Sequence, residues 1–493
     1  MQRYLIVLSV MFVAVLEVLD MTIVNVALPD MMGNLSANVT QITWVLTSYT
    51  LAAAIFIPLT GLLSKLFGVK TLLLINVVGF GIFSTICGLT PNLEILVLGR
   101  FMQGIFGAAL VPLSQTIVRN AFSQEEQGKA MAIWGMGIMV APVFGPPVGG
   151  FIINNLDWRW IFFVNIPICI LSFFLITKLI KPIPKEQVKI DYTGLILMVT
   201  TVMSLQLVLD HGNEKDWLSS EFIQAMLTIG IIGFIIFIIR GLQIKNNIIN
   251  LNIFKNLCFS SACLALSIFS AAIFACLTLF PLYLQSMLGF DAYQSGMISM
   301  PMGIASAIGM IFVSKLIKTI GPKKCVAIGV TCSIIATYLC SYFTLNLDTN
   351  YIIFTLSLLG FGMGMFFVPL STLSFQTIPK NLSTEASGLY VFCRNIGSSV
   401  GIALSATLLS RNKQYMWHSL GEHLNVYNPN LKTWIEHTGF SLDKPETYAI
   451  LQYQLERQAN IIALEEVFFS LFITMVCLVP IIFFIKIDNS IKK

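Results

Sequence analysis

Residues 16–29 read LEVLDMTIVNVALP, and two acidic side chains, Glu17 and Asp20, stand there among Leu, Val, Ile, Met and Ala. The rest of the chain is similarly apolar, since 56% of its 493 residues are hydrophobic and only 11% are charged. The mean hydropathy of +0.83 is far above that of water-soluble domains. The composition therefore predicts an integral membrane protein, with this stretch inside the bilayer.

Apolar runs long enough to cross a bilayer recur along the whole sequence. A hydrocarbon core of about 30 Å requires roughly 20 apolar residues in a helix, whereas barrel strands are about half as long and alternate apolar with polar residues. About fourteen runs meet the helical requirement, centred near residues 16, 52, 80, 105, 142, 169, 200, 230, 272, 302, 335, 364, 397 and 474. The first run is too long for a signal peptide and lacks a small-residue cleavage site, so we expect it to remain as the first helix.

The placement of charge predicts how the chain is oriented. One set of alternate loops carries most of the cations, including Lys65, Lys70, Lys178, Lys315 and Lys323, and the opposite set carries most of the acids. The positive-inside rule then places both termini in the cytoplasm. Because these cations are spread along short loops, a role in nucleic-acid binding is not expected. The ten cysteines lie in or beside apolar runs, where neither disulfides nor a metal site is indicated.

An internal repeat divides the sequence. SKLFGVK begins at Ser64 and SKLIKTIGPKK begins at Ser314, while VPLS occurs at 111–114 and again at 368–371. Two matches in the same order and at similar depth indicate two parallel six-helix halves. We therefore predict an N-terminal half at 1–182, an inserted helix pair at 183–250 and a C-terminal half at 251–493, a 6+2+6 arrangement. A long outward loop is expected at 411–460.

Several motifs, taken in order, carry a resemblance to a known family. They are LDMTIVNVALP, GLLSKLFGVK, LGRFMQG, APVFGPPVGG, DWRWIFFVNIP, LDHGNEKDW and EASGLYVFCRNIGSSVG. With them, nearly the whole chain resembles the fourteen-helix drug:proton antiporters of the major facilitator superfamily, of the EmrB/QacA type. The resemblance implies the major facilitator fold, a place in the cytoplasmic (inner) membrane of a bacterium and a role in multidrug efflux. It also implies, by analogy, a periplasmic adaptor protein and an outer-membrane channel as partners.

Two of these motifs are expected to act in conformational change. Proline removes backbone hydrogen bonds and glycine permits close helix approach, so the helix that contains APVFGPPVGG is expected to kink against a neighbour. In the family this is the antiporter motif, although ordinary helix packing is the alternative. The expected conformational residues are Gly61, Lys65, Gly68, Lys70, Pro142, Gly145, Pro146, Gly149 and Gly150. Lys65 stands where the superfamily usually has an aspartate, so any gating role of that aspartate does not carry over.

The two acids of the opening stretch are candidates for proton coupling. An acid at the centre of an isolated membrane helix costs about 2.5 to 3.5 kcal/mol, so Glu17 and Asp20 are expected to face protein or water. Residues three apart share a helix face, and two carboxylates that close favour uptake of a proton by one of them. The resemblance agrees, because Asp20 occupies the family's acidic position in the first helix. The alternative is that one acid only accepts hydrogen bonds from a neighbouring helix.

Two arginines lie within predicted helices. Arg100 requires a partner, for which the acids of the first helix or backbone carbonyls are candidates. If Arg100 approaches Asp20 in only one conformation, it would expel the proton there; a fixed interhelical anchor is the alternative. Arg394 has Asn395, Gly397 and two serines nearby, which favours close packing over contact with substrate.

Six residues are candidates for contact with substrate. Aromatic and amide groups suit an apolar, or even cationic, compound, although such side chains are also common in lipid-facing and core positions. The candidates are Asn25, Trp44, Tyr49, Gln103, Phe392 and Arg394.

The sequence therefore predicts a secondary exporter of amphipathic small molecules, embedded in membrane lipids and driven by protons. A proton-coupled symporter for a small organic solute or anion is the alternative, and a passive channel would need no titrating pair. An enzyme is not expected, because all four histidines lie in predicted outward loops. No nucleotide-binding GxxxxGK[ST] loop occurs, and neither a cofactor nor a metal is expected, the proton being the coupling ion. The histidines at 411–460 match no metal-ligand spacing, so that segment is expected to be a cap or a docking surface.

Overall fold

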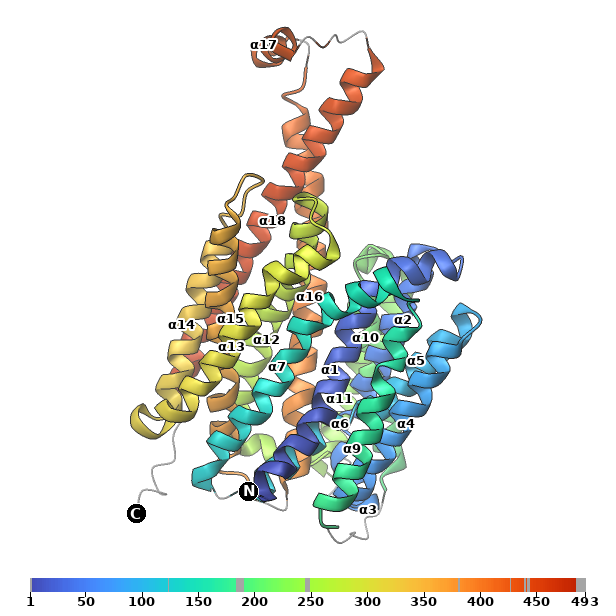
Figure 1. Ribbon diagram of the computed structural model, residues 1–493, viewed down its shortest axis with the longest axis vertical. Coiled ribbons are helices and arrows are strands. Elements are labelled where there is room, and N and C mark those ends of the chain that lie inside the picture. The colour runs from blue at the N-terminus through green and yellow to red at the C-terminus, as the bar shows by residue number, and fades with distance from the viewer. Residues whose placement is uncertain are drawn as a thin grey trace.

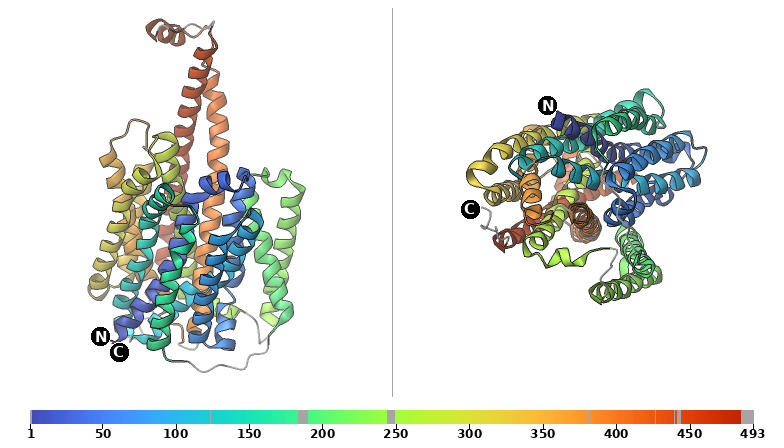
Figure 2. Two further views of the ribbon diagram at one scale, coloured as in Figure 1. Left: turned by 45° about the vertical axis from the view of Figure 1, so that its right-hand side comes forward. Right: turned by 90° about the horizontal axis from the view of Figure 1, so that it is seen from below.

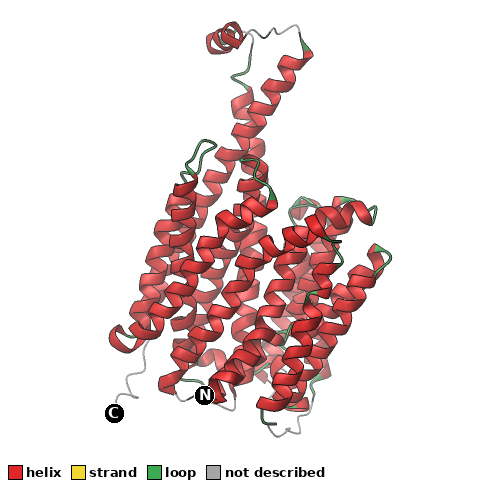
Figure 3. Ribbon diagram, in the orientation of Figure 1, coloured by secondary structure: helices red, strands yellow, loops and turns green. Residues whose placement is uncertain are grey.

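The computed structural model describes residues 2–122, 124–182, 190–243, 249–379, 382–425, 427–438, 440 and 444–484. Within these ranges the regular elements are helices and no strand occurs (Figure 3). An all-helical chain satisfies its backbone hydrogen bonds internally, as the bilayer requires. The predicted all-α membrane fold is therefore confirmed.

In the described part of the chain, nine helices precede the predicted inserted pair. They are α1 (Gln2–Asn34), α2 (Val39–Phe56), α3 (Thr60–Phe67), α4 (Val69–Leu89), α5 (Leu93–Gly107), α6 (Leu110–Ala121), α7 (Gln124–Asn155), α8 (Trp160–Phe163) and α9 (Asn165–Leu179). The pair itself is α10 (Tyr192–His211) and α11 (Glu221–Gln243). The remainder are α12 (Leu257–Leu282), α13 (Ala292–Ile320), α14 (Pro322–Cys340), α15 (Thr349–Phe375), α16 (Ser383–Gly421), α17 (Pro429–Thr438) and α18 (Pro445–Phe484) (Figure 1).

Twelve helical segments of the described chain are long and apolar enough to cross a membrane, and the bent pair α2 and α3 makes thirteen. The bend of 64° falls at a short break that contains Pro58, which cannot donate a backbone hydrogen bond. α7, at 32 residues, is not among these thirteen. The chain is thus a multi-pass membrane protein, and the count of fourteen crossings stays a prediction.

The helices before and after the inserted pair form two bundles, and α10 and α11 lie at their periphery (Figure 2). α10 packs against α11, and it also contacts α2 of the first bundle and α16 of the second. The start of α1 and the end of α18 lie at the same end of the molecule (Figure 1). The exact domain boundaries stay a prediction; residues 183–189, where the first one falls, lie outside the described residues.

The proline-rich helix α7 packs between the two bundles, with α1 on one side and α13 on the other. A Cβ atom at Gly149 would lie 3.3 Å from a methyl group of Ile23 on α1, and one at Gly296 on α13 would lie 2.8 Å from the Pro147 ring. Gly145 packs against Thr22 of α1. Small residues therefore allow α7 to lie close to both α1 and α13. A change in the relative position of the two bundles would have to alter these contacts.

The predicted outward loop at 411–460 is largely helical. α16 continues as one helix to Gly421, α17 forms a short separate helix, and α18 begins at Pro445. The resulting two-helix projection extends well beyond the bundles (Figures 1 and 2). The difference arises because hydropathy locates apolar spans, whereas this projection is built from polar helices whose backbone bonds are satisfied locally. Residues 426, 439 and 441–443 lie outside the described residues.

Candidate functional site

The Asp20 carboxylate lies at the centre of a fully buried hydrogen-bond network. One oxygen accepts from Arg100 Nη1 at 2.5 Å. The other accepts from Gln103 Nε2 at 3.1 Å and from Asn165 Nδ2 at 2.7 Å. All four side chains have 0% relative exposure. A charge so far from water is retained only when it is paired and hydrogen-bonded, and Asp20 meets that condition.

Arg100 is held from several directions. Its Nη1 also donates to Gln103 Oε1 at 2.8 Å, and its Nε donates to the Val45 carbonyl oxygen at 3.2 Å. The guanidinium carbon lies 4.3 Å from the centre of the Tyr49 ring, a cation–π distance. Arg100 and Gln103 are three residues apart on α5, so the helical repeat places both on one face. In the structure that face meets α1 and α2.

Asn165 and Ser84 complete the network, and the sequence did not identify either residue. Asn165 Nδ2 donates to Ser84 Oγ at 3.0 Å, and Ser84 Oγ donates to the Phe162 carbonyl oxygen at 2.8 Å. The available signal was an amide in the segment FFVNIPICI, which is otherwise apolar. Amides in such segments usually bond to another helix.

Glu17 has a different environment from Asp20, although the two are three residues apart on α1. It is 6% exposed, and its Oε2 has no hydrogen-bond partner. Glu17 lines a cavity that Asp20 does not reach. The shared helix face was predicted from the spacing, but the structure gives one acid a full set of donors and leaves the other facing open space.

That space, the central cavity, has an empty volume of about 1270 Å³, including the part open to solvent. Helices of both bundles and the inserted helix α10 contribute to its wall. The lining residues are Glu17, Val18, Met21, Tyr49, Thr50, Ala53, Ala54, Ile138, Pro142, Gln206, Phe274, Leu277, Met302, Gly303, Ser306, Met363, Phe392, Arg394, Asn395, Ile396, Ser398, Ser399 and Ile402. A large, mostly apolar cavity with a few polar groups is typical of a site for small organic molecules.

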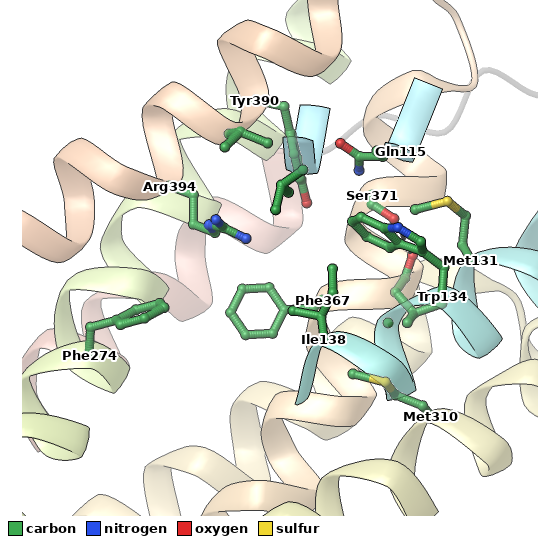
Figure 4. A pocket seen from close by; sticks show the side chains of 14 residues that line it. Gln115, Met131, Trp134, Ile138, Phe274, Met310, Phe367, Ser371, Tyr390 and Arg394 are labelled. Carbon is green, nitrogen blue, oxygen red and sulfur yellow. Dashed lines mark hydrogen bonds between the residues drawn. The ribbon is translucent and has the colours of Figure 1, made fainter. Parts of the chain in front are cut away.

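A second cavity adjoins the first and shares Ile138, Phe274 and Arg394 with it. It has an empty volume of about 600 Å³, including open solvent, and helices α6, α7, α12, α13, α15 and α16 line it. The Arg394 side chain extends toward this space, with Phe274 on one side and Tyr390 on the other (Figure 4). Arg394 Nε donates to Asn395 Oδ1 at 3.3 Å. Arg394 is thus part of the wall of both cavities, and its contact with substrate, the less favoured alternative from the sequence, stays a prediction.

Of the other substrate candidates, two line the central cavity and three do not. Tyr49 and Phe392 line the central cavity. Gln103 belongs to the Asp20 network instead. Trp44 is 37% exposed and lies 4.9 Å, between ring centres, from His211, while Asn25 is exposed; neither lines a described cavity.

The short helix α3 joins the two bundles through a charge pair. Lys65 forms an ion pair with Glu385 of α16, and the side chain of Glu385 packs on Gly61, where a Cβ atom would lie 2.7 Å from its Cγ. Gly68 links α3 to α4 with φ of 83°, a conformation that favours glycine. Lys70 Nζ donates to the Thr177 carbonyl oxygen at 2.8 Å. The lysine that replaces the usual aspartate therefore has its own acidic partner across the interface.

Arg119 of α6 provides a second contact between the bundles, through hydrogen bonds and an aromatic ring rather than an ion pair. Its Nη1 donates to Ser383 Oγ at 3.0 Å and its Nη2 donates to the Phe375 carbonyl oxygen at 3.3 Å. The guanidinium also lies 3.9 Å from the centre of the Phe375 ring. Together with Lys65, this residue connects the first bundle to α15 and α16.

Charge reversal at Lys65 is expected to weaken this interface. In Lys65→Glu two carboxylates would face each other, and a hydrogen bond between charged groups worth about 1.5 to 3 kcal/mol would be lost. We expect the free energy of unfolding to fall by about 2 kcal/mol, measured by denaturation of the purified protein. The exchanged pair Lys65→Glu with Glu385→Lys should recover most of the loss, and Lys181→Glu, at an exposed lysine, serves as the matched control. An exchanged pair as unstable as the single variant would show that attraction between these charges is not the stabilising interaction.

Among the described residues no group of three or more His, Cys, Asp or Glu side chains is arranged to hold a metal ion. His211, one of the four histidines, lies at the end of α10 and its Nδ1 is 3.1 Å from a carboxylate oxygen of Glu214.

Comparisons with known proteins agree with this architecture. Residues 10–402 match the Major Facilitator Superfamily. The chain is 34% identical to the Multidrug export protein EmrB of Haemophilus influenzae, covering 98% of this chain and 95% of the relative. It is 35% identical to the Fatty acid resistance protein FarB of Neisseria gonorrhoeae, covering 97% and 95%. For Escherichia coli EmrB the identity is 32%, covering 96% and 93%.

Solved structures share the fold at low sequence identity. The human organic anion transporter MFSD10 (TETRAN) superposes with a TM-score of 0.62 at 13% identity, covering 96% of this chain and 99% of that one. The proton:xylose symporter XylE superposes with a TM-score of 0.61 at 15% identity, covering 94% of each. Taken with the sequence match, these likenesses confirm the resemblance noted from the motifs. The chain belongs to the Major Facilitator Superfamily and, within it, to the group that contains the EmrB export proteins.

Proposed function

We propose that the protein exports amphipathic drugs or other toxic organic compounds across the membrane in exchange for protons. The observation that carries this proposal is the position of Glu17. Its carboxylate has an unpartnered oxygen and faces an apolar cavity lined by both bundles, one helical turn from the buried Asp20. A carboxyl there can exchange a proton with solvent or with a bound compound. The similarity to multidrug export proteins supports export rather than another activity.

Alternating access would use the contacts between the bundles. With Lys65, Glu385 and Arg119 in place, one end of the interface is closed, and we propose that this end faces the cytoplasm. Protonation of Glu17 or Asp20 from outside would then favour return to the inward-open form. Each proton that enters down 100 mV supplies about 2.3 kcal/mol, so neither a nucleotide nor another cofactor is required. We propose no enzymatic step.

The proposal includes a location and partners. We place the chain in the cytoplasmic membrane of a bacterium, with both termini in the cytoplasm and the α16–α18 projection on the outer side. By analogy with the relatives, a periplasmic adaptor and an outer-membrane channel would receive the exported compound. The polar helices of the projection give such an adaptor a surface that stands clear of the lipid.

The direction of transport tests the proposal. In inside-out vesicles from an efflux-deficient host, a fluorescent amphipathic dye such as ethidium should accumulate when the lumen is made acidic. A protonophore should abolish the accumulation, and vesicles without the protein provide the control. Dye that instead leaves the acidic lumen would indicate symport, and accumulation that persists with the protonophore would exclude proton drive.

A further inference from the structure

The inserted helix pair reaches the central cavity through one side chain. Gln206 of α10 lines the cavity together with Ser399 of α16, although its residue exposure is only 5%. The remainder of the pair lies at the periphery of the two bundles (Figure 2). A polar side chain so enclosed requires partners, and the Gln206 amide nitrogen has two of them.

The orientation of the Gln206 amide follows from these partners. Its Nε2 donates to Asp210 Oδ1 at 3.0 Å and to Ser399 Oγ at 3.3 Å, which uses both of its hydrogens. A carboxylate only accepts, so the nitrogen of the amide has to be the atom on the Asp210 side. Gln206 Oε1 then has no donor among the described residues. Asp210 thus positions Gln206 so that an acceptor stays available at the cavity wall.

We propose that Gln206 is a specificity-determining residue of the central cavity, and that its Oε1 accepts a hydrogen bond from an N–H group of the exported compound. The ligand class is an amphipathic ammonium compound that carries at least one N–H. Its charge would be matched by the Glu17 carboxylate, and its apolar part would pack on side chains such as Phe274, Met302 and Phe392. This inference rests on the proposed function, because it concerns which compounds the cavity accepts.

The experiment compares two ligands with the same tail. Octylammonium has N–H donors, whereas octyltrimethylammonium has none. For the purified full-length protein, calorimetry should give about tenfold tighter binding of octylammonium, the difference expected for one hydrogen bond to a charged group. In Gln206→Leu this ratio should fall to near one, while the affinity for octyltrimethylammonium stays the same. Because misfolding would weaken the binding of both ligands, the ratio of the two affinities separates a loss of specificity from structural damage.

Two further variants complete the test. Asp210→Asn removes the obligate acceptor and permits the Gln206 amide to turn over, so the affinity ratio should fall without reaching one. Gln224→Leu changes an exposed glutamine on α11, outside the cavity, and should leave the ratio unchanged. Failure of the unmodified protein to prefer octylammonium, or an unchanged ratio in Gln206→Leu, would overturn the inference. Selective binding without gradient-driven export would instead contradict the proposed function and leave this assignment standing.

Discussion

Replacing Asp20 by asparagine is expected to abolish proton-driven transport and to lower the free energy of unfolding by about 3 to 5 kcal/mol. Asp20 accepts hydrogen bonds from Arg100, Gln103 and Asn165. An asparagine offers one acceptor oxygen to these donors and leaves the buried guanidinium without a counter-charge. Denaturation of the purified variant measures the stability, and dye accumulation in inside-out vesicles measures the transport.

A second variant separates the two effects of Asp20→Asn. Combining it with Arg100→Gln removes both charges, and replacing a whole buried pair costs far less stability than breaking it. We therefore expect the double variant to regain much of the lost stability and to remain inactive in gradient-driven transport. Normal transport by a correctly inserted Asp20→Asn protein would contradict the coupling role of this residue.

Replacing Glu17 by glutamine is expected to uncouple transport while the fold stays intact. The Glu17 Oε2 has no hydrogen-bond partner, so the substitution breaks no network. The glutamine cannot bind a proton, so the two conformations no longer differ in proton affinity at this position. A proton gradient then cannot shift the equilibrium between them through residue 17. Gradient-driven accumulation should fall at least about tenfold, while exchange of an uncharged substrate, which does not need the Glu17 charge, should persist across the membrane without a gradient.

The control for Glu17→Gln is Glu94→Gln, which changes an exposed acid in the first turn of α5 and should leave both kinds of transport unchanged. Comparing accumulation with exchange is informative because a merely damaged cavity would lower both. Full accumulation by Glu17→Gln would exclude this residue from proton coupling and leave Asp20 as the remaining candidate.

Hydropathy predicted most of the fold, because the membrane-spanning segments are long and apolar whereas the loops between them are short and polar. It did not reveal breaks within a span, such as the 64° bend between α2 and α3 near Pro58. A run of apolar residues looks the same whether its helix is straight or bent. It also did not predict the continuation of α16 to Gly421 or the short helix α17, which carry many polar side chains.

Residue spacing predicted which side chains share a helix face, but not what each face meets. The structure brings Arg100 to Asp20, one of the partners considered from the sequence, and adds Asn165, which was not considered. It also places Glu17, rather than Asp20, at the central cavity. Contacts between helices depend on crossing angles and on which helix is adjacent, and a single sequence records neither. The functional roles of all these residues stay predictions.

The length of α16 has a mechanical consequence. One uninterrupted helix of 39 residues carries Glu385 at the contact with α3, Arg394 at the cavities and His418 near its far end. At 1.5 Å per residue, His418 lies about 50 Å along the helix axis from Glu385. If this helix tilts as a rigid body when the Lys65 contact opens, its distal end is displaced much further than the end at Glu385. A molecule bound to the distal end would be displaced with it, and its binding would therefore be coupled to each conformational change.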